Sequence, residues 1–337
     1  MQWKPFQPEK TAAEWDDLPA RASDDNPFQS SAWADYKGRM GWRPHRWVTE
    51  GRDGAVLCAV QLLRKPLPFG RSLLWAPGGP MIGFPDGVGE DLGLILSKGL
   101  QQICRAHRAL YARFYCLQSA APAPLQGFSA FGRAPRRRLG SGVTVQVDLS
   151  LSEGELGPGM DRKHRYMVRR AGKNSLTWRW GSGEALLADF ERLHAEMSTA
   201  KKVLSQELRD LQWLASDFRE NALFLIGYLG GEAVTGCLVL LKGKGAFYWR
   251  AATARKGREL SAAYAMVPEL FRRLKSAGIQ RFDFGGILPG VPAAAGINHF
   301  KRGFGGLLVE YVGEWEWANP SWIRWGVNTW IAGRGQG

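Results

Sequence analysis

The hydrophobic positions between residues 184 and 218 recur at helical spacing. Leu186, Phe190, Leu193 and Met197 would share one face of a helix over 184–197, because residues three and four apart lie on the same side of an α-helix. A second helix is predicted from Ser205, with that serine as its N-cap. This part of the chain is therefore expected to form two amphipathic helices in succession.

The pattern changes to strands at residue 222. Three runs rich in β-forming residues fill 222–253, and they are separated by Gly230-Gly231 and by Gly243-Lys244-Gly245. Short glycine-containing connections between such runs indicate hairpins. A helix is predicted over 261–278, and the strand "QRFDF" follows it directly. The expected order is two helices, a three-stranded meander, a helix and a strand.

The first half of the chain repeats this order loosely. "HRWVTE" and "AVLCAVQLLRK" flank the turn "GRDG", and "SLLWAP" is a third strand. "DLGLILSKGLQQICRAH" predicts a helix and "LYARFYCLQ" the strand after it, while "SSAWADYKGRM" upstream predicts a short helix capped by serine. No sequence identity recurs at a fixed period, so the two halves share an order of helices and strands rather than a sequence repeat.

A meander followed by a helix and a returning strand resembles the plan of the GNAT acyltransferase fold. The chain has 337 residues, which suits two such units. We therefore expect an α/β (α+β) protein with two tandem GNAT-like domains, mixed and mainly antiparallel sheets, and a cleft between the domains. The predicted ranges are 1–148 with 317–337 for the first domain, since the tail can pack back on it, and 149–316 for the second.

Composition narrows the classes of protein. Apolar residues make up 45% of the chain, but no run of 18 apolar residues is present, so no membrane span is expected. The N-terminus lacks the features of a signal peptide, which favours the cytoplasm. The four cysteines form no CxxC, so neither a zinc site nor a disulfide framework is indicated.

Several kinds of active site are not indicated. The sequence has no GxSxG elbow and no GxxxxGK[ST] phosphate loop. The five histidines are scattered along the chain, and we predict no metal site. The segment "ATARKGRELSAAY" does not meet the pyrophosphate loop of CoA-dependent members of the fold, which weakens an acetyl-CoA reaction. We expect no cofactor.

The chain is strongly basic, with a formal net charge of +14, which favours a phosphate-rich partner. The densest basic stretch is 161–173, "DRKHRYMVRRAGK". On a helix, four of its cations at spacings of three and four residues, Arg162, Arg165, Arg169 and Lys173, would form one stripe that neutralises several phosphates of an RNA. The alternative is a solvated helix face. The residues predicted to contact RNA are Arg162, Arg165, Arg169, Arg170 and Lys173, and "RAPRRR" at 133–138 is a second basic cluster.

Four segments resemble motifs of the FemABX family of tRNA-dependent, nonribosomal peptidyltransferases, which build peptidoglycan branches. They are "SAWADYKGRMGW", "LLWAPGGPMIG", "KHRYMVRRAGKN" and the most specific, "GIQRFDFGGI…INHFKRGFGG". The last resembles the family's strand ending in Asp-Phe-Gly-Gly, a loop, then Phe-Lys and Phe-Gly. The coiled-coil insertion of some members has no counterpart between Lys173 and Leu223.

The resemblance implies a reaction. Family members move an aminoacyl group from aminoacyl-tRNA to an amine on the stem peptide of a peptidoglycan precursor, either lipid II or a UDP-linked muropeptide, without metal or CoA. Alternatives on the same scaffold are tRNA-dependent synthesis of a peptide natural product and CoA-dependent N-acyl transfer. A third class is a non-catalytic protein that binds RNA or a membrane surface. A monomer is expected.

The resemblance also implies site residues. Lys301, with Phe300 beside it, would stabilise the oxyanion or the tRNA terminus, in a loop that Gly285 and Gly286 begin. Lys37, in one motif with Trp33 and Tyr36, would hold the acceptor's diphosphate. The arginine and tyrosine with which the family holds the acceptor have no direct match, and the nearest substitutes are Lys202, Arg209 and Tyr264.

Tryptophans gather near the C-terminus in "EWEWANPSWIRWGVNTW". A tail rich in tryptophan and containing arginine can contact a membrane interface. The favoured alternative is that it folds back on the core. Peripheral contact with the inner face of the cytoplasmic membrane therefore stays an open possibility beside a cytoplasmic location.

Overall fold

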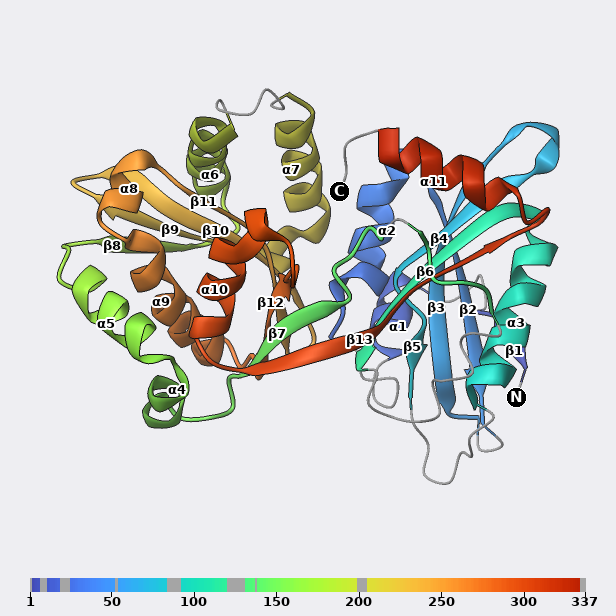
Figure 1. The fold of residues 1–337 in the computed structure, drawn as a ribbon, viewed down its shortest axis with the longest axis horizontal. Coiled ribbons are helices and arrows are strands. Elements are labelled where there is room, and N and C mark those ends of the chain that lie inside the picture. Colours follow the sequence, from blue (N-terminus) through green and yellow to red (C-terminus); the bar gives the residue numbers. More distant parts are fainter. Residues whose placement is uncertain are drawn as a thin grey trace. The chain divides into compact units, whose positions relative to one another are not determined.

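The chain folds into two units, each with its own β-sheet (Figure 1). Unit 1 comprises Met1–Gly142 and Glu310–Gly337, and unit 2 comprises Val143–Val309. The structure is a computed structural model, and it describes residues 2–6, 11–18, 25–51, 54–83, 92–119, 131–136, 138–198 and 205–333. In that part of the chain, no helix is long and apolar enough to cross a membrane.

The sheet of unit 1 has the strand order β1-β2-β3-β4-β6-β13, and β5 pairs with β3. All neighbours are antiparallel except β4 and β6, which run parallel because helix α3 connects them. The elements are β1 Trp3–Pro5, α1 Ala12–Asp16, the 3-10 turn Pro27–Gln29, α2 Ser31–Gly38, β2 Arg43–Glu50, β3 Val56–Pro66, the 3-10 turn Pro68–Gly70, β4 Ser72–Gly78, β5 Met81–Ile82, α3 Leu92–Ala106, β6 Ala109–Ser119, β13 Leu307–Ala318 and α11 Ile323–Gly333.

Successive residues of β6 serve opposite faces of this sheet, as the strand period requires. Ala112 and Phe114 belong to the core that Leu96 and Leu100 of α3 complete. On the opposite face, Tyr111 donates a hydrogen bond to Glu316 of β13 over 2.9 Å, and Glu316 in turn accepts from Asn328 of α11. Helix α11 is thus fastened to the sheet face opposite α3.

The sheet of unit 2 has the strand order β7-β12-β11-β10-β9-β8, and among its pairs only β11 and β12 are parallel. Helix α9 connects those two strands. The elements are β7 Val143–Asp148, α4 Glu153–Gly159, α5 Arg162–Ala171, β8 Thr177–Gly181, α6 Glu184–Ser198, α7 Ser205–Phe218, the 3-10 turn Arg219–Asn221, β9 Ala222–Leu229, β10 Glu232–Lys242, β11 Gly245–Thr253, α8 Arg255–Glu259, α9 Ala262–Ser276, β12 Arg281–Gly286, the 3-10 turn Pro292–Ala294 and α10 Ala295–Gly303.

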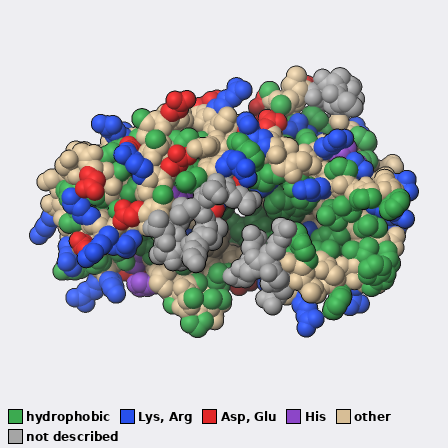
Figure 2. Space-filling view, turned by 90° about the horizontal axis from the view of Figure 1, so that it is seen from above, with side chains coloured by type: hydrophobic (Ala, Val, Ile, Leu, Met, Phe, Trp, Pro, Cys, Tyr) green, Lys and Arg blue, Asp and Glu red, His purple; other side chains and the backbone are tan. Residues whose placement is uncertain are grey.

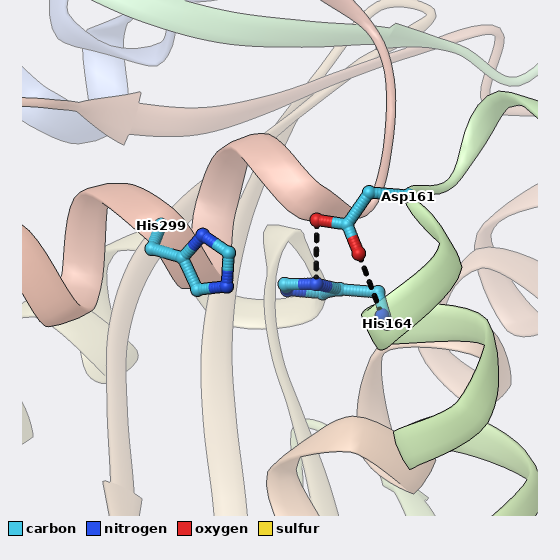
Figure 3. A group of neighbouring side chains, drawn as sticks. All are labelled: Asp161, His164 and His299. Atoms are coloured by element: carbon cyan, nitrogen blue, oxygen red, sulfur yellow. Dashed lines mark hydrogen bonds and ion pairs between the residues drawn. The ribbon is translucent and has the colours of Figure 1, made fainter.

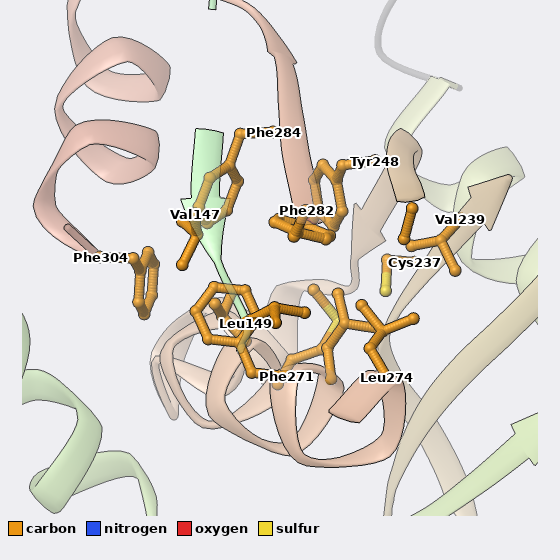
Figure 4. Packing of buried hydrophobic residues seen from close by; sticks show 14 of the residues in the cluster. Val147, Leu149, Cys237, Val239, Tyr248, Phe271, Leu274, Phe282, Phe284 and Phe304 are labelled. Atoms are coloured by element: carbon orange, nitrogen blue, oxygen red, sulfur yellow. The ribbon is translucent and has the colours of Figure 1, made fainter. Parts of the chain in front are cut away.

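Aromatic rings dominate the core of unit 2 (Figure 4). Phe282 and Phe284 of β12 lie with their ring centroids 4.8 Å apart, and Phe271 of α9 lies 5.2 Å from Phe282. Phe304, directly after α10, stacks on Phe284 at 5.9 Å. Fully burying a phenylalanine is worth about 1.5–3 kcal/mol, so these rings fix the end of β12 against α9 and α10.

The order of meander, helix and strand predicted for each half is confirmed, and so is the helix over 184–197. The unit boundaries differ from the predicted ranges at two places. Residues 143–148, predicted in the first domain, form β7 and pair with β12 of unit 2. Residues 310–316, predicted in the second domain, lie in β13, whose Tyr311 to Ala318 pair with β6.

The segment before Gly305 is the main correction to the predicted secondary structure. A glycine- and proline-rich loop carrying the Phe-Lys pair is predicted there, but Ala295–Gly303 form helix α10. Between Lys173 and Leu223 the described helices are α6 and α7, with 15 and 14 residues. A coiled-coil insertion is therefore not seen among the residues described in that interval, as predicted.

Candidate active site

Lys301 lies on helix α10 with its side chain turned inward. Its exposed fraction is 9%, which is low for a lysine. The ammonium donates to the carbonyl oxygens of Gly286 over 2.7 Å and of Gly285 over 3.3 Å. Gly285 has φ +69°, a left-handed conformation that favours glycine. The Gly-Gly pair at the end of β12 thus turns the backbone so that two carbonyls face Lys301.

Asp283 fixes the strand end that Lys301 contacts. Its carboxylate accepts from the backbone nitrogen of Gly285 over 2.6 Å, from Gln146 over 3.1 Å and from the hydroxyl of Thr144. Burial lowers the pKa of Lys301, and the negative charge of Asp283 opposes that shift. A lysine ammonium has three N–H donors. The two glycine carbonyls occupy two of them among the described residues, so the third can serve a substrate oxygen.

His164 of α5 holds helix α10 in place (Figure 3). The ring is fully buried, and its Nε2 lies 3.1 Å from the carbonyl oxygen of Phe300. Its Nδ1 lies 2.9 Å from Oδ2 of Asp161, a contact that becomes an ion pair when the imidazole is protonated but is not aligned as a hydrogen bond. The backbone nitrogen of Asp161 donates to the carbonyl of Gly303 over 3.0 Å. Two contacts therefore join helices α5 and α10 around Lys301: His164 with Phe300, and Asp161 with Gly303.

The position of the His164 ring explains why residue 303 is a glycine. A Cβ atom at that position would lie 2.0 Å from Cε1 of His164, much closer than a real carbon contact allows. The ring is also bounded by Tyr264 and Phe304, with centroids 5.1 and 4.9 Å away. Tyr264 packs in turn on Phe300 at 5.3 Å. Burial raises the pKa of the Tyr264 phenol, so this tyrosine stays neutral and can donate a hydrogen bond.

Asp161, His164 and His299 offer ligand atoms that lie within 4.8 Å of one another. The histidines are scattered in sequence, but the fold brings two of them together with a carboxylate. This group could hold a metal ion by geometry alone. However, the Asp161 carboxylate already accepts from the backbone nitrogen of His164 as the N-cap of α5, and the His164 ring contacts the carbonyl of Phe300 on α10. Arg302 lines the same pocket. A neighbouring guanidinium disfavours a bound cation, so we assign the group to the positioning of α10.

The basic residues of α5 are exposed at Arg162, Arg165, Arg169 and Arg170, and Lys173 is exposed just beyond the helix. Arg165 has a structural role, because its guanidinium donates to the carbonyls of Met160 over 2.7 Å and of Pro158 over 3.1 Å. Helix α5 therefore carries the exposed cations and also holds α10, the helix of Lys301, through His164.

The predicted acceptor residues of unit 1 form a cation–aromatic cluster on α2. The ammonium of Lys37 lies 4.4 Å from the ring centroid of Tyr36, 4.8 Å from that of Trp33 and 5.5 Å from that of Trp75 on β4. Trp33 and Tyr36 are buried and Lys37 is half-buried. The two aromatic residues therefore act as a platform for Lys37, and the lysine is the group that a ligand can reach.

Arg209 is not brought into either cluster. Arg209 lies exposed on α7, its guanidinium 5.0 Å from the ring of Trp213. Lys202 lies outside the described residues. In unit 2 the structure gathers Lys301, Phe300, Tyr264, Gly285 and Gly286.

Comparison of the sequence with known proteins gives one family match. Residues 230–322 match the model of the FemAB family. This segment contains β10 and β11, Asp-Phe-Gly-Gly and the Phe-Lys pair. No curated protein matches the chain.

Among solved structures, FemX is similar at 17% identity with a TM-score of 0.78, covering 96% of this chain and 99% of that one. The C-terminal domain of a putative lysylphosphatidylglycerol synthetase from Agrobacterium fabrum is similar at 14% identity, TM-score 0.53 and coverages of 95% and 97%. A tandem GNAT protein from the clavulanic acid biosynthesis pathway is similar at 13% identity, TM-score 0.51 and coverages of 94% and 97%. These likenesses establish the fold.

The predicted class, an α/β protein of the tandem GNAT-like acyltransferase fold, is confirmed by these neighbours. The family match and the fold together support an acyltransferase. The match of residues 230–322 to the FemAB family model agrees with the resemblance seen in the sequence, and FemX shares the fold over nearly the whole chain.

Proposed function

We propose that this protein transfers an amino acid from aminoacyl-tRNA to an amine on the stem peptide of a peptidoglycan precursor, lipid II or UDP-MurNAc-pentapeptide. The observation that carries the proposal is Lys301, a buried ammonium held by two glycine carbonyls with a third donor to spare. Aminolysis of an ester develops negative charge on the carbonyl oxygen. A preorganised cation stabilises that charge more effectively in a partly dry site than in water.

The proposed roles follow from the two clusters. In unit 2, Lys301 stabilises the oxyanion, Phe300 and Tyr264 shape its surroundings, and the exposed cations of α5 bind the tRNA backbone. In unit 1, Lys37 binds phosphate of the acceptor on its aromatic platform. The aminoacyl ester is already activated, so positioning of the amine and electrostatic stabilisation of the oxyanion suffice. The proposed reaction uses no metal or cofactor.

The test is a matrix of charged tRNAs against UDP-muropeptide and lipid II, with acyl-CoA donors in parallel. Transfer of labelled amino acid from at least one charged tRNA to one precursor supports the proposal. Transfer from acyl-CoA alone would instead establish CoA-dependent N-acylation on the same fold. Transfer from charged tRNA only to small peptide acceptors would indicate a natural-product enzyme, and binding of tRNA without transfer would indicate a non-catalytic protein.

The pH profile tests whether Lys301 acts as an ammonium. Burial lowers the pKa of Lys301 and Asp283 raises it, so Asp283→Asn should lower that pKa further. If the charged form is needed, kcat/KM falls as pH rises through the pKa, and the alkaline limb should move to lower pH in Asp283→Asn. Lys301→Arg should retain activity at high pH if the guanidinium fits, because arginine stays charged. An unchanged alkaline limb in Asp283→Asn would argue against a titrating Lys301.

The salt dependence of tRNA binding tests the helix α5 surface. Replacing Arg162, Arg169 and Arg170 with glutamine should weaken binding and reduce the slope of log Kd against log salt by roughly two to three, about one per lost phosphate contact. Arg165 is kept, since it caps α4. Arg272→Gln on α9, whose arginine pairs with Glu269, is the control and should leave the slope unchanged. An unaltered slope in the triple variant would contradict this assignment.

A further inference from the structure

Helix α11 exposes an unusual face. Trp322, Trp325 and Trp330 are 72%, 71% and 57% exposed, which is rare for a side chain of this size. Trp325 and Trp330 lie on one side of α11 at helical spacing, together with the exposed Gly326 and Thr329, and Trp322 directly precedes the helix. Among the residues described from 322 to 331, no charged side chain stands on this side. This α11 tryptophan face is therefore aromatic, uncharged and open to solvent.

The other side of the helix packs on unit 1. Asn328 donates to Glu316 of β13 over 2.9 Å and to the carbonyl of Arg324 over 2.8 Å, and Ile331 is buried. The tryptophan-rich tail thus packs on its unit, as favoured from the sequence. The residues that pack are polar and aliphatic, however, and Trp322, Trp325 and Trp330 remain exposed.

A basic pocket borders the tryptophan face. Arg133, Arg136 and Arg324 line it together with Trp325 and Thr329. The one acid in its lining, Glu316, is buried and accepts from Tyr111 and Asn328. The backbones of Arg133 and Glu316 bond to each other over 2.9 and 3.0 Å, so Arg133 is fixed beside α11. Figure 2, seen onto this side, shows hydrophobic side chains gathered over unit 1 with Lys and Arg at their edge.

An anionic lipid surface fits both features. Tryptophan is enriched where protein meets the interface of a membrane, because its ring is apolar and its N–H is polar. Arginine pairs well with phosphate, and basic residues beside an anionic leaflet add to binding. We propose that the α11 tryptophan face enters the interfacial layer of an anionic membrane while Arg133, Arg136 and Arg324 bind phosphate headgroups at its edge. This surface is formed by unit 1, and it shares no residue with the Lys301 cluster of unit 2.

Vesicle flotation of the full chain, without any substrate, tests this binding. Wild type should partition onto vesicles of phosphatidylcholine with phosphatidylglycerol and much less onto phosphatidylcholine alone. Trp325→Ser with Trp330→Ser should lower the partition coefficient on the anionic vesicles by about tenfold or more. Arg133→Gln with Arg136→Gln should lower it about thirtyfold, from roughly one kcal/mol for each cation near the surface.

Matched controls come from the same unit. Phe69→Ser removes an aromatic that is 92% exposed on the turn between β3 and β4, and Arg43→Gln with Arg71→Gln removes two exposed cations. Both should partition as wild type. The proposal is overturned if wild type does not float, if the tryptophan variant floats unchanged, or if inorganic phosphate competes fully with vesicles. Sedimentation that shows a dimer lost in the tryptophan variant would assign the face to a second copy instead. Since no tRNA or precursor is present, the outcome is independent of the transferase assay.

Discussion

Replacing Lys301 with methionine is expected to lower kcat for aminoacyl transfer by about a hundredfold to a thousandfold, the usual cost of removing one donor from an oxyanion site. Methionine fills a similar volume, so the substitution removes the charge and the donors while keeping the packing. The measurement is single-turnover transfer from charged tRNA to the precursor that the substrate matrix identifies. Binding of tRNA should change much less, because the exposed cations of α5 are untouched.

The control for this loss is Lys256→Met, which removes an exposed lysine of the same unit that pairs only with Glu232 in the described structure. It should transfer at the wild-type rate. A rate within a few-fold of wild type for Lys301→Met would remove Lys301 from the catalytic machinery. A rate lost together with tRNA binding would show instead that Lys301 holds the donor substrate.

Much of the secondary structure follows from local pattern. The meander is readable because glycine pairs stand between runs of β-forming residues, and α9 is readable because its apolar residues keep a helical period up to the glycine that ends it. Helix α10 is not readable in this way. Its first turn consists of alanine, glycine and isoleucine after a proline, and Ile297 faces solvent. The helix forms because Phe300, Phe304 and the contact with His164 hold it on unit 2.

Only part of the candidate site can be predicted from the sequence around each residue. Lys301 and Gly285-Gly286 stand out in the sequence through a specific motif, although their bond cannot be read from it. His164 and Asp283 were missed. His164 reads as one lone histidine in a basic stretch, and its partner Phe300 is 136 residues away. The available signal was Asp161 three residues before His164, which is typical of a helix N-cap and places the histidine in the first turn. Only the packing of α5 on α10 makes that histidine part of the site.

Gly303→Ala is expected to destabilise the protein by about 3 kcal/mol, at the upper end of the usual cost of overpacking a filled interior. The new methyl group would lie 2.0 Å from His164, and that ring is enclosed by Tyr264 and Phe304. Either His164 or α10 must move, and both displace Lys301, so transfer should fall as well. The control is Gly296→Ala in the same helix, where nothing lies within 4 Å. There, alanine should stabilise the protein by up to about 1 kcal/mol.

A double-mutant cycle separates this clash from other effects of Gly303→Ala. His164→Ala alone loses the bond to Phe300 and the ring packing, so it should destabilise by about 2–3 kcal/mol. In that background the ring is gone, and Gly303→Ala should cost less than about 1 kcal/mol, since residues in contact couple strongly. Urea unfolding of the four proteins gives the coupling free energy. Equal costs of Gly303→Ala with and without His164 would mean that the glycine is needed for some other reason. Coupling in stability without any loss of transfer in Gly303→Ala would mean that His164 holds α10 but does not set the position of Lys301.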